Sequence, residues 1–264
     1  MLDNLCYFGI FVYKRQLVNS LNFILIGKKS MIKSRDKNIN LSKLNIKPGF
    51  LESKLISEKI ADVLRENIIS GTIKGGQKLN ENQISTALNV SRPPIREAFR
   101  ILATQGLITL VPRKGAFVTQ LSVEEVREIY QIRSMMESFA TTLVIPAIDQ
   151  KQIYEIQLIL KSMEKKIKEN NSKDIQKLNL EFHQKIIKMS KNMKLVQLYD
   201  SIILLIRRYQ VLGLSAPISW KMSLDEHRKI VDAIVAKDVD RAEKLSREHV
   251  MAAASRVIEQ LKKQ

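Results

Sequence analysis

The chain has 264 residues, room for two modest domains or one large one, and its 45% hydrophobic and 27% charged residues are ordinary for a globular protein. Its formal net charge of +17 favours an anionic partner, such as nucleic acid, a membrane surface or an acidic ligand. The single cysteine, Cys6, excludes an intrachain disulfide and suits a reducing compartment, so we expect a cytoplasmic protein.

The positive charge is concentrated in the N-terminal part. Residues 1–120 contain 19 lysines and arginines against 8 acidic residues, a net charge of +11. Residues 121–264 contain 25 against 19, a net charge of +6 over a longer stretch. We therefore expect the anion-binding surface to lie in the N-terminal part.

Residues 1–50 are interpreted as a leader followed by a flexible basic arm. The apolar runs CYFGIFVY and LNFILIG are too short to span a bilayer, and no small-residue cleavage site follows them. We interpret the first 30 residues as a start-site artefact, with true initiation at Met31. The alternative is a membrane-associating tail; our expectation is that the protein has no membrane partner.

Residues 51–120 have the pattern of a winged helix–turn–helix. Apolar residues at helical spacing predict a first helix that ends at Gly71, and NENQISTALNV predicts a short second helix that ends at Asn89. In SRPPIREAFRILATQG, Ser91 is a natural N-cap and the two prolines fit only in a first turn, so a third helix is expected. The β-rich runs LITLV and AFVTQ flank the turn PRKG and predict a β-hairpin.

Three arginines share one face of the predicted third helix. Arg92, Arg96 and Arg100 are four residues apart, and their face is opposite the apolar side of the helix. Such a row suits the major groove of DNA, where guanidinium groups pair with guanine or phosphate, and the basic hairpin tip can approach the DNA backbone. The alternative is a solvated basic face with Glu97 as its local ion-pair partner.

After residue 121 the strand signals stop and helical patterns follow. A capping box at residues 122–125 begins a helix that Pro146 ends. Further helices are expected at roughly 150–170, 173–190, 193–213, 217–236 and 239–262. Residues 121–264 therefore predict an all-α antiparallel bundle, and the chain as a whole is expected to be mainly α.

All three histidines fall on core-facing sides of separate predicted helices. His183 follows Asn179 by one turn beside an apolar stripe, and His227 and His249 lie in line with apolar residues of later helices. A single inward histidine is usually a hydrogen-bonded core residue, but helical bundles also build metal sites from facing helices. A metal site and a metal-free polar cavity therefore both remain open.

A metal-dependent hydrolase that uses the three histidines to activate water is the alternative of a different class. No His-Glu-x-x-His motif is present, and Glu181, which we expect to be the nearest carboxylate, faces outward. We therefore expect that the protein is not an enzyme.

The stretch SRPPIREAFRILATQGLITLVPRKGAFV resembles the winged helix–turn–helix signature of GntR-type bacterial transcription regulators. The resemblance implies that Arg92, Arg96 and Gly115 contact DNA, and it suggests Arg100 and Lys114 as further contacts.

The match covers about residues 55 to 120 and departs from the family pattern at two positions. Asn82 replaces a usual arginine, and Pro93 replaces a usual threonine. Each change removes a contact to phosphate or base, so operator preference is expected to differ while the fold is kept.

Residues 124–262 resemble the all-helical FCD ligand-binding domain of the FadR branch of the same family. The marks are Arg-x-x-x-Glu in IYQIRSMMESFA, Asn-x-x-Phe-His, Glu-His-Arg and a histidine in the last helix. The resemblance implies a divalent metal, with zinc, nickel or manganese left open, and these ligands: Asn179, His183, His227 and His249. An uncharged amide at the first ligand position is expected to weaken the site relative to aspartate.

The same resemblance implies a small carboxylate effector beside the metal. Arg133 is the residue we expect to pair with that carboxylate, because its fork of donors matches the carboxylate oxygens. The alternative role for Arg133 is a structural ion pair with Glu137, four residues on.

These inferences predict a bacterial transcription regulator, expected to act as a homodimeric repressor on a pseudo-palindromic double-stranded DNA operator. Residues 51–120 would bind DNA, and residues 121–264 would bind the effector and dimerise. The linker at residues 120–123 is the expected hinge. A metal-free ligand-sensing regulator is the alternative within the same class.

Overall fold

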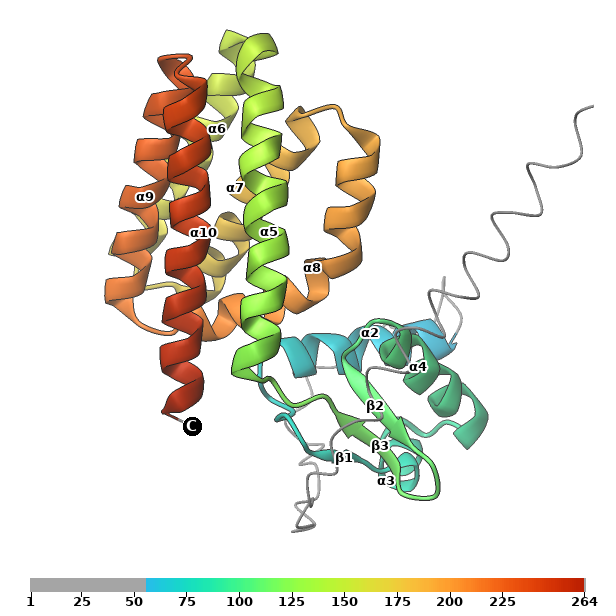
Figure 1. Cartoon of the computed structure of the whole chain (residues 1–264). Helices are drawn as coiled ribbons and strands as arrows, with labels where there is room; N and C mark the ends of the chain where they lie inside the picture. Colours follow the sequence, from blue (N-terminus) through green and yellow to red (C-terminus); the bar gives the residue numbers. More distant parts are fainter. Residues whose placement is uncertain (1–55, 264) are drawn as a thin grey trace, which may run out of the picture. The chain divides into compact units, whose positions relative to one another are not determined.

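The protein is described by a computed structural model that covers residues 56–263, so the leader and arm predicted for residues 1–50 lie outside the described residues. The described chain begins with three helices and a small sheet and continues with helices (Figure 1). The predicted fold class, mainly α with an N-terminal winged helix–turn–helix, is confirmed.

The N-terminal part combines three helices with a three-stranded antiparallel sheet. The sheet has the order β1-β3-β2, with Lys78 paired to Phe117 and Thr109 also paired to Phe117 from the other side. The predicted hairpin is β2–β3. The bounds are α2 (Ile56–Ile69), β1 (Lys78–Leu79), α3 (Glu81–Leu88), α4 (Arg92–Thr104), β2 (Ile108–Val111) and β3 (Gly115–Val118).

The turn between α3 and α4 is formed by residues that the sequence marks clearly. Asn80 caps α3 by accepting from two backbone N–H groups, and Asn89 ends α3 in the left-handed conformation with φ 50°. Two prolines occupy the first turn of α4, where no intrahelical N–H is required. The apolar face of α4 is buried, which leaves the opposite face free for a ligand; the buried residues are Ile95, Ala98, Phe99 and Leu102.

The C-terminal part is a helical bundle, as predicted. Its helices begin at polar caps such as Asp149, Asn192 and Asp238, which accept hydrogen bonds from the first turn. Helix α10 packs along α5 and α9 (Figure 1). The bounds are α5 (Val123–Val144), η2 (Ile145–Ala147), α6 (Gln150–Lys168), α7 (Ser172–Met189), α8 (Met193–Gly213), α9 (Pro217–Val235) and α10 (Val239–Lys262).

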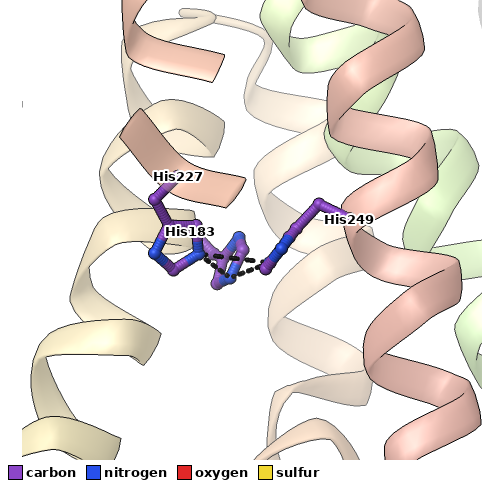
Figure 2. Close-up of side chains that lie close together, drawn as sticks. All are labelled: His183, His227 and His249. Carbon is purple, nitrogen blue, oxygen red and sulfur yellow. Dashed lines mark hydrogen bonds between the residues drawn. The ribbon is translucent and has the colours of Figure 1, made fainter. Parts of the chain in front are cut away.

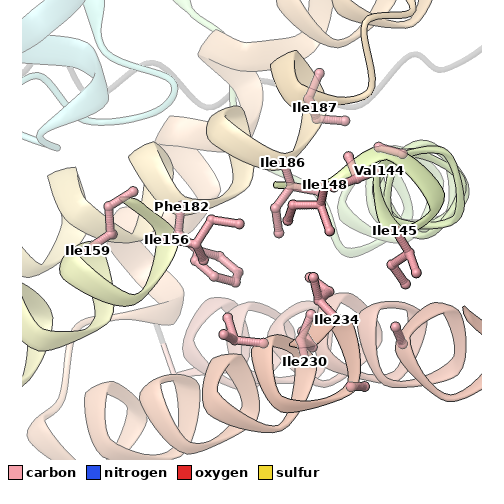
Figure 3. Close-up of a cluster of buried hydrophobic side chains, with 14 of the residues drawn as sticks. Val144, Ile145, Ile148, Ile156, Ile159, Phe182, Ile186, Ile187, Ile230 and Ile234 are labelled. Carbon is pink, nitrogen blue, oxygen red and sulfur yellow. The ribbon is translucent and has the colours of Figure 1, made fainter. Parts of the chain in front are cut away.

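An apolar core holds the bundle helices in fixed relative positions. Figure 3 shows isoleucine, valine and phenylalanine side chains from α5, α6, α7 and α9 packed together. Phe182 is fully buried, and its ring lies 4.1 Å from the ring of His227, measured between centroids. Burying a side chain of this size contributes roughly 1.5–3 kcal/mol. This packing fixes α7 against α9 beside the histidines.

Within residues 56–263, no helix is both long enough and apolar enough to cross a bilayer.

Candidate metal centre and nucleic-acid interface

The three histidines converge from three helices. His183 lies on α7, His227 on α9 and His249 on α10, and Figure 2 shows their imidazoles pointing toward one another. The Nε2 atom of His227 lies 3.3 Å from that of His183 and 3.1 Å from that of His249, and the last two are 3.4 Å apart. All three side chains are buried. The prediction that they face inward on separate helices is confirmed.

Two carboxylates orient two of these rings from outside the cluster. The Nδ1 atom of His183 lies 2.9 Å from Oε2 of Glu137, and Nδ1 of His249 lies 2.6 Å from Oε2 of Glu226. With these glutamates ionised and acting only as acceptors, Nδ1 carries the proton and donates it. The Nε2 lone pairs of His183 and His249 are therefore aimed at the centre of the cluster.

His227 is oriented differently. Its Nδ1 atom has no hydrogen-bond partner among the described residues, so packing against Phe182 holds the ring. Of the three imidazoles, only that of His227 is free to place a proton on Nε2. One such proton cannot satisfy all three close nitrogen pairs, so the cluster has a surplus of lone pairs at its centre.

Each orienting carboxylate is itself held by an arginine. Arg133 donates from Nε to Oε1 of Glu137 at 2.6 Å, and the Tyr199 hydroxyl donates to the same oxygen at 2.8 Å. Arg256 donates through both terminal nitrogens to the two oxygens of Glu226, at 2.8 and 2.9 Å. Such charge-assisted pairs fix the carboxylates in position.

The electrostatics keep the glutamates ionised. Although burial opposes ionisation, Arg133 and then His183 hold the pKa of Glu137 well below its usual range. Burial also opposes ionisation of Glu226, but the hydrogen bonds from His249 and Arg256 lower its pKa to about 2. Both side chains are therefore carboxylates at neutral pH.

The same environment keeps the imidazoles neutral, which is their metal-binding form. Burial lowers the pKa of His183 to about 4, against the opposing charge of Glu137. Burial, followed by the neighbouring His249, lowers the pKa of His227 well below its ordinary value. Burial also lowers the pKa of His249, although Glu226 opposes the change. Three neutral imidazole nitrogens, the form that ligates a metal, therefore face one point at pH 7.

The nitrogen separations fit a metal ion. A tetrahedral ion with metal–nitrogen bonds of about 2.0–2.1 Å would hold its nitrogen ligands about 3.3–3.4 Å apart. The observed separations of 3.1–3.4 Å between Nε2 atoms agree with that value. The residues present therefore fit a divalent ion bound by three imidazoles, with at least one position left for another ligand.

A small cavity lies on one side of the histidines, and we call it the arginine cavity. Its volume of about 20 Å³ is enough for a water molecule. Its lining also includes the apolar residues Leu214, Ala253 and Val257, and Gly213 allows α8 to approach Val257 closely. The polar lining residues are Tyr130, Arg133, Asn179, Gln210, Ser223, His249 and Arg256.

Two residues expected at this site take definite positions in the arginine cavity. Asn179 is buried in the wall, and its Oδ1 accepts a hydrogen bond from the Ser223 hydroxyl at 3.1 Å. Arg133 lines the cavity and also forms the ion pair with Glu137. The two roles considered for Arg133 are thus compatible, because the hydrogen bond from its Nε to Glu137 uses one of its five N–H groups.

One expectation about this site is wrong. Glu181 is exposed, as predicted, but it is not the nearest carboxylate, because Glu137 and Glu226 contact the histidines directly. Glu137 lies on another helix, 46 positions before His183, and its approach depends on how α5 packs against α7. No local spacing could reveal this contact.

Arg256 is a cavity residue that was not singled out from the sequence. It lies seven positions after His249, which is two helical turns on the same face of α10. This seven-residue spacing is the sequence signal that could have placed Arg256 beside His249. The adjacent arginines Arg207 and Arg208 of α8 do not line the cavity.

The arginine row of α4 is exposed, as expected for a nucleic-acid interface. Arg96 donates from Nε to Glu81 of α3 at 2.9 Å, and Arg100 donates to Glu97 at 3.1 Å. These are solvent-exposed pairs, which contribute little stability. Arg92 is exposed at the first position of α4.

The hairpin tip also presents basic residues to solvent. Arg113 and Lys114 are exposed, and Arg113 adopts a positive φ of 61°. Gly115 has φ 102°, a conformation that side chains rarely adopt, which explains why glycine follows the basic pair.

Comparisons with known proteins identify the two parts of the chain that carry these candidate sites. The family described as "Bacterial regulatory proteins, gntR family" matches residues 56–118, and the family "FCD domain" matches residues 128–252. The HTH-type transcriptional regulator YdhC of Bacillus subtilis (strain 168) is 33% identical over 201 residues, which are 75% of this chain and 88% of the relative. The chain belongs to the GntR family. It is a GntR transcription regulator with an FCD domain.

Other similar proteins support the same assignment for this GntR regulator. The gluconate operon transcriptional repressor of Bacillus licheniformis is 31% identical over 187 residues, covering 69% of this chain and 76% of the relative. The solved structure of E. coli McbR/YncC has a TM-score of 0.66 at 18% identity, covers 79% of this chain and 100% of that chain, and shows the shared fold. The family consists of DNA-binding transcription regulators and not of enzymes, so the hydrolase alternative is set aside.

Proposed function

We propose that this GntR regulator is a homodimeric repressor whose operator binding is controlled by a small organic acid, held with a divalent metal in the FCD part. The observation that carries the proposal is the convergence of three neutral Nε2 atoms beside a cavity lined by arginine. Relatives with repressor names, including the gluconate operon repressors, support the repressor assignment.

The DNA-binding part would be residues 51–120, with residues 121–264 as the effector-binding and dimerisation part. The exposed residues proposed to contact double-stranded operator DNA are Arg92, Arg96, Arg100, Lys114 and Gly115. Arginine side chains on α4 would pair with guanine or phosphate in the major groove, and the hairpin tip would approach the backbone.

The metal would be held by the three imidazoles and the amide oxygen of Asn179. Such an ion supplies a Lewis-acid position at which a carboxylate is bound. Three imidazoles at near-tetrahedral separations suit zinc, while nickel and manganese bind the same donor types in other geometries. The chain's own Glu137 and Glu226 would keep the ring nitrogens aimed at the ion.

The effector would be a small acid whose carboxylate reaches the metal and Arg133. The cavity of about 20 Å³ is water-sized, so a bound acid requires the surrounding helices to move apart. This movement would favour a placement of the two DNA-binding parts that does not match the half-site spacing, with residues 120–123 as the hinge.

Elemental analysis and native mass spectrometry of the purified full-length protein test the metal and the dimer together. A dimer with about one zinc, nickel or manganese ion per chain is expected. A dimer that contains no metal, and whose DNA binding still responds to an acid in the presence of a chelator, would instead support the metal-free regulator.

DNA binding is tested by selecting bound sequences from a random double-stranded pool and measuring the affinity of the enriched sequence by fluorescence anisotropy. We expect a pseudo-palindrome, released by at least one acid among lactate, malate, succinate, citrate and gluconate. If no sequence is enriched, or if every acid leaves DNA binding unchanged, the proposed control by an organic acid is wrong.

A further inference from the structure

The structure contains a second arginine that connects the arginine cavity to a histidine. Arg256 lines the cavity, and its side chain is 12% exposed. It makes two parallel hydrogen bonds to Glu226, whose Oε2 also accepts from Nδ1 of His249 at 2.6 Å. The three side chains form a continuous chain of charge-assisted contacts, which we call the Arg256 relay.

A corresponding chain reaches a second histidine through Glu137. Arg133 contacts Glu137, which contacts Nδ1 of His183. The two arginines come from different helices, α5 and α10, yet both line the arginine cavity. The cavity therefore presents two guanidinium groups beside His249.

Both arginines keep donors for another anion. Arg256 uses two of its five N–H groups for Glu226. Arg133 uses its Nε–H for Glu137, and its guanidinium also contacts the hydroxyls of Tyr130 and Tyr199. A ligand carboxylate can therefore bind each guanidinium without breaking the existing ion pair.

The charge at the site supports this arrangement: two arginines balance two glutamates, and the histidines are neutral. A divalent ion would add two positive charges, which an acid carrying two carboxylates would neutralise.

We propose that Arg256 and Arg133 together recognise an acid with two carboxylates, and that the Arg256 relay couples acid binding to metal binding through His249. An anion on Arg256 draws its charge away from Glu226, which then accepts more strongly from Nδ1 and makes Nε2 a better metal ligand. By linkage, bound metal strengthens acid binding by the same factor. This inference rests on the proposed metal- and acid-binding function.

The first test compares Arg256→Gln with Arg247→Gln, a matched change of an exposed arginine on the same helix. The protein is loaded with zinc and then exchanged into buffer without free zinc. Calorimetry measures the binding of malate and succinate, with lactate as the acid that has one carboxylate. We expect Arg256→Gln to weaken malate or succinate binding at least 10-fold and to reduce the preference over lactate, while Arg247→Gln resembles the wild type. If Arg256→Gln does not fold, Arg256→Lys keeps the charge, loses the fork, and should still weaken binding.

The second test compares Glu226→Gln with Asp225→Asn, its exposed neighbour. Zinc affinity is measured by competition with a chromophoric chelator, and the Co²⁺ absorption spectrum reports the geometry of the site. Loss of an orienting carboxylate should lower metal affinity by about 10- to 100-fold and change the Co²⁺ bands. The melting temperature of the metal-free protein shows whether the variant is merely less stable, which would shift that temperature and leave the Co²⁺ spectrum unchanged.

The outcomes separate this inference from the proposed function. If the wild type binds zinc and an acid but Arg256→Gln binds malate and succinate with wild-type affinity, the second arginine has no role in recognition. If Glu226→Gln keeps wild-type zinc affinity and Co²⁺ bands, the relay is wrong. If the wild type binds neither zinc nor any of the acids, the proposed function fails and this inference fails with it.

Discussion

The Nδ1 atom of His249 lies 2.6 Å from Oε2 of Glu226, so a carboxylate from the neighbouring helix decides which ring nitrogen faces the centre of the histidine cluster. Glu226 directly precedes His227 in the chain, yet it orients the histidine of the next helix. One short segment of α9 therefore supplies one donor to the cluster and orients another.

Removing one imidazole should abolish tight metal binding. His183→Gln leaves two histidines and a buried Glu137 without its imidazole partner, so zinc affinity should fall by more than about 100-fold, a larger effect than loss of an orienting residue. Chelator competition on the purified dimer measures this. Glu181→Gln, an exposed change two positions earlier on α7, should leave the affinity unchanged. Equal affinities for both variants would contradict the metal site.

Converting the buried amide to a carboxylate should strengthen the site. If Asn179 ligates the ion, Asn179→Asp replaces a neutral oxygen with a charged one and should raise zinc affinity about 10-fold or more, because the added Coulomb attraction is large in a buried site. The metal-free variant should be less stable, since it buries an extra negative charge. Gln157→Glu, which adds the same charge at an exposed position of α6, is the control. An unchanged affinity would show that Asn179 is not a ligand.

The exposed arginines of α4 should determine operator affinity. Arg92→Ala and Arg96→Ala are each expected to cost about 1–3 kcal/mol of binding to the selected operator if they contact bases, measured by anisotropy at two salt concentrations. Arg241→Ala removes an exposed arginine at the start of α10 and should have little effect. Undiminished binding by the double variant Arg92→Ala/Arg96→Ala would disprove the assignment of α4 as the recognition helix.

The metal-free protein should lose stability as the pH falls below about 6.5. All three histidines of the chain are in the cluster, and each has a pKa lowered by burial, to about 4 for His183. The unfolded chain takes up protons near pH 6.5 and the folded chain does not, so stability is present above 6.5 and is lost toward the lower folded-state pKa. At pH 5.5 the loss is about 1.4 kcal/mol for each histidine that stays neutral.

Urea denaturation of the chelator-treated protein at pH 7.5 and 5.5 measures this difference. Saturating zinc at pH 7.5 should raise the denaturation midpoint, because the ion binds only the folded state. Identical midpoints for the metal-free protein at both pH values would show that the buried histidines do not control the acid stability.

Adding a methyl group at the end of α8 should disturb the arginine cavity. A Cβ at Gly213 would lie 2.9 Å from Cγ2 of Val257, a stiff and fully buried side chain, so Gly213→Ala should destabilise the protein by about 1–3 kcal/mol. Thermal unfolding checks this, and the double variant Gly213→Ala/Val257→Ala should recover part of the loss. If the Gly213→Ala variant is as stable as the wild type, α8 and α10 separate easily at the cavity and the prediction is wrong.

Much of the fold could be predicted because it depends on local signals. The prolines at the start of α4, the left-handed Asn89 and the polar caps of the bundle helices all act within a few residues of their own position. The inward direction of the three histidines follows equally from helical periodicity, because each lies in line with apolar residues on its own helix.

The amino-acid sequence by itself determined the element order, the basic face of α4 and the presence of one inward histidine on each of three helices. Only the tertiary structure decided that their Nε2 atoms meet within 3.4 Å, that Glu137 and Glu226 orient the rings, and that Arg256 joins Arg133 at one cavity. The physical reason is that periodicity specifies which side of a helix is buried, whereas contacts between helices depend on how far each helix slides and rotates against its neighbours in the packed core.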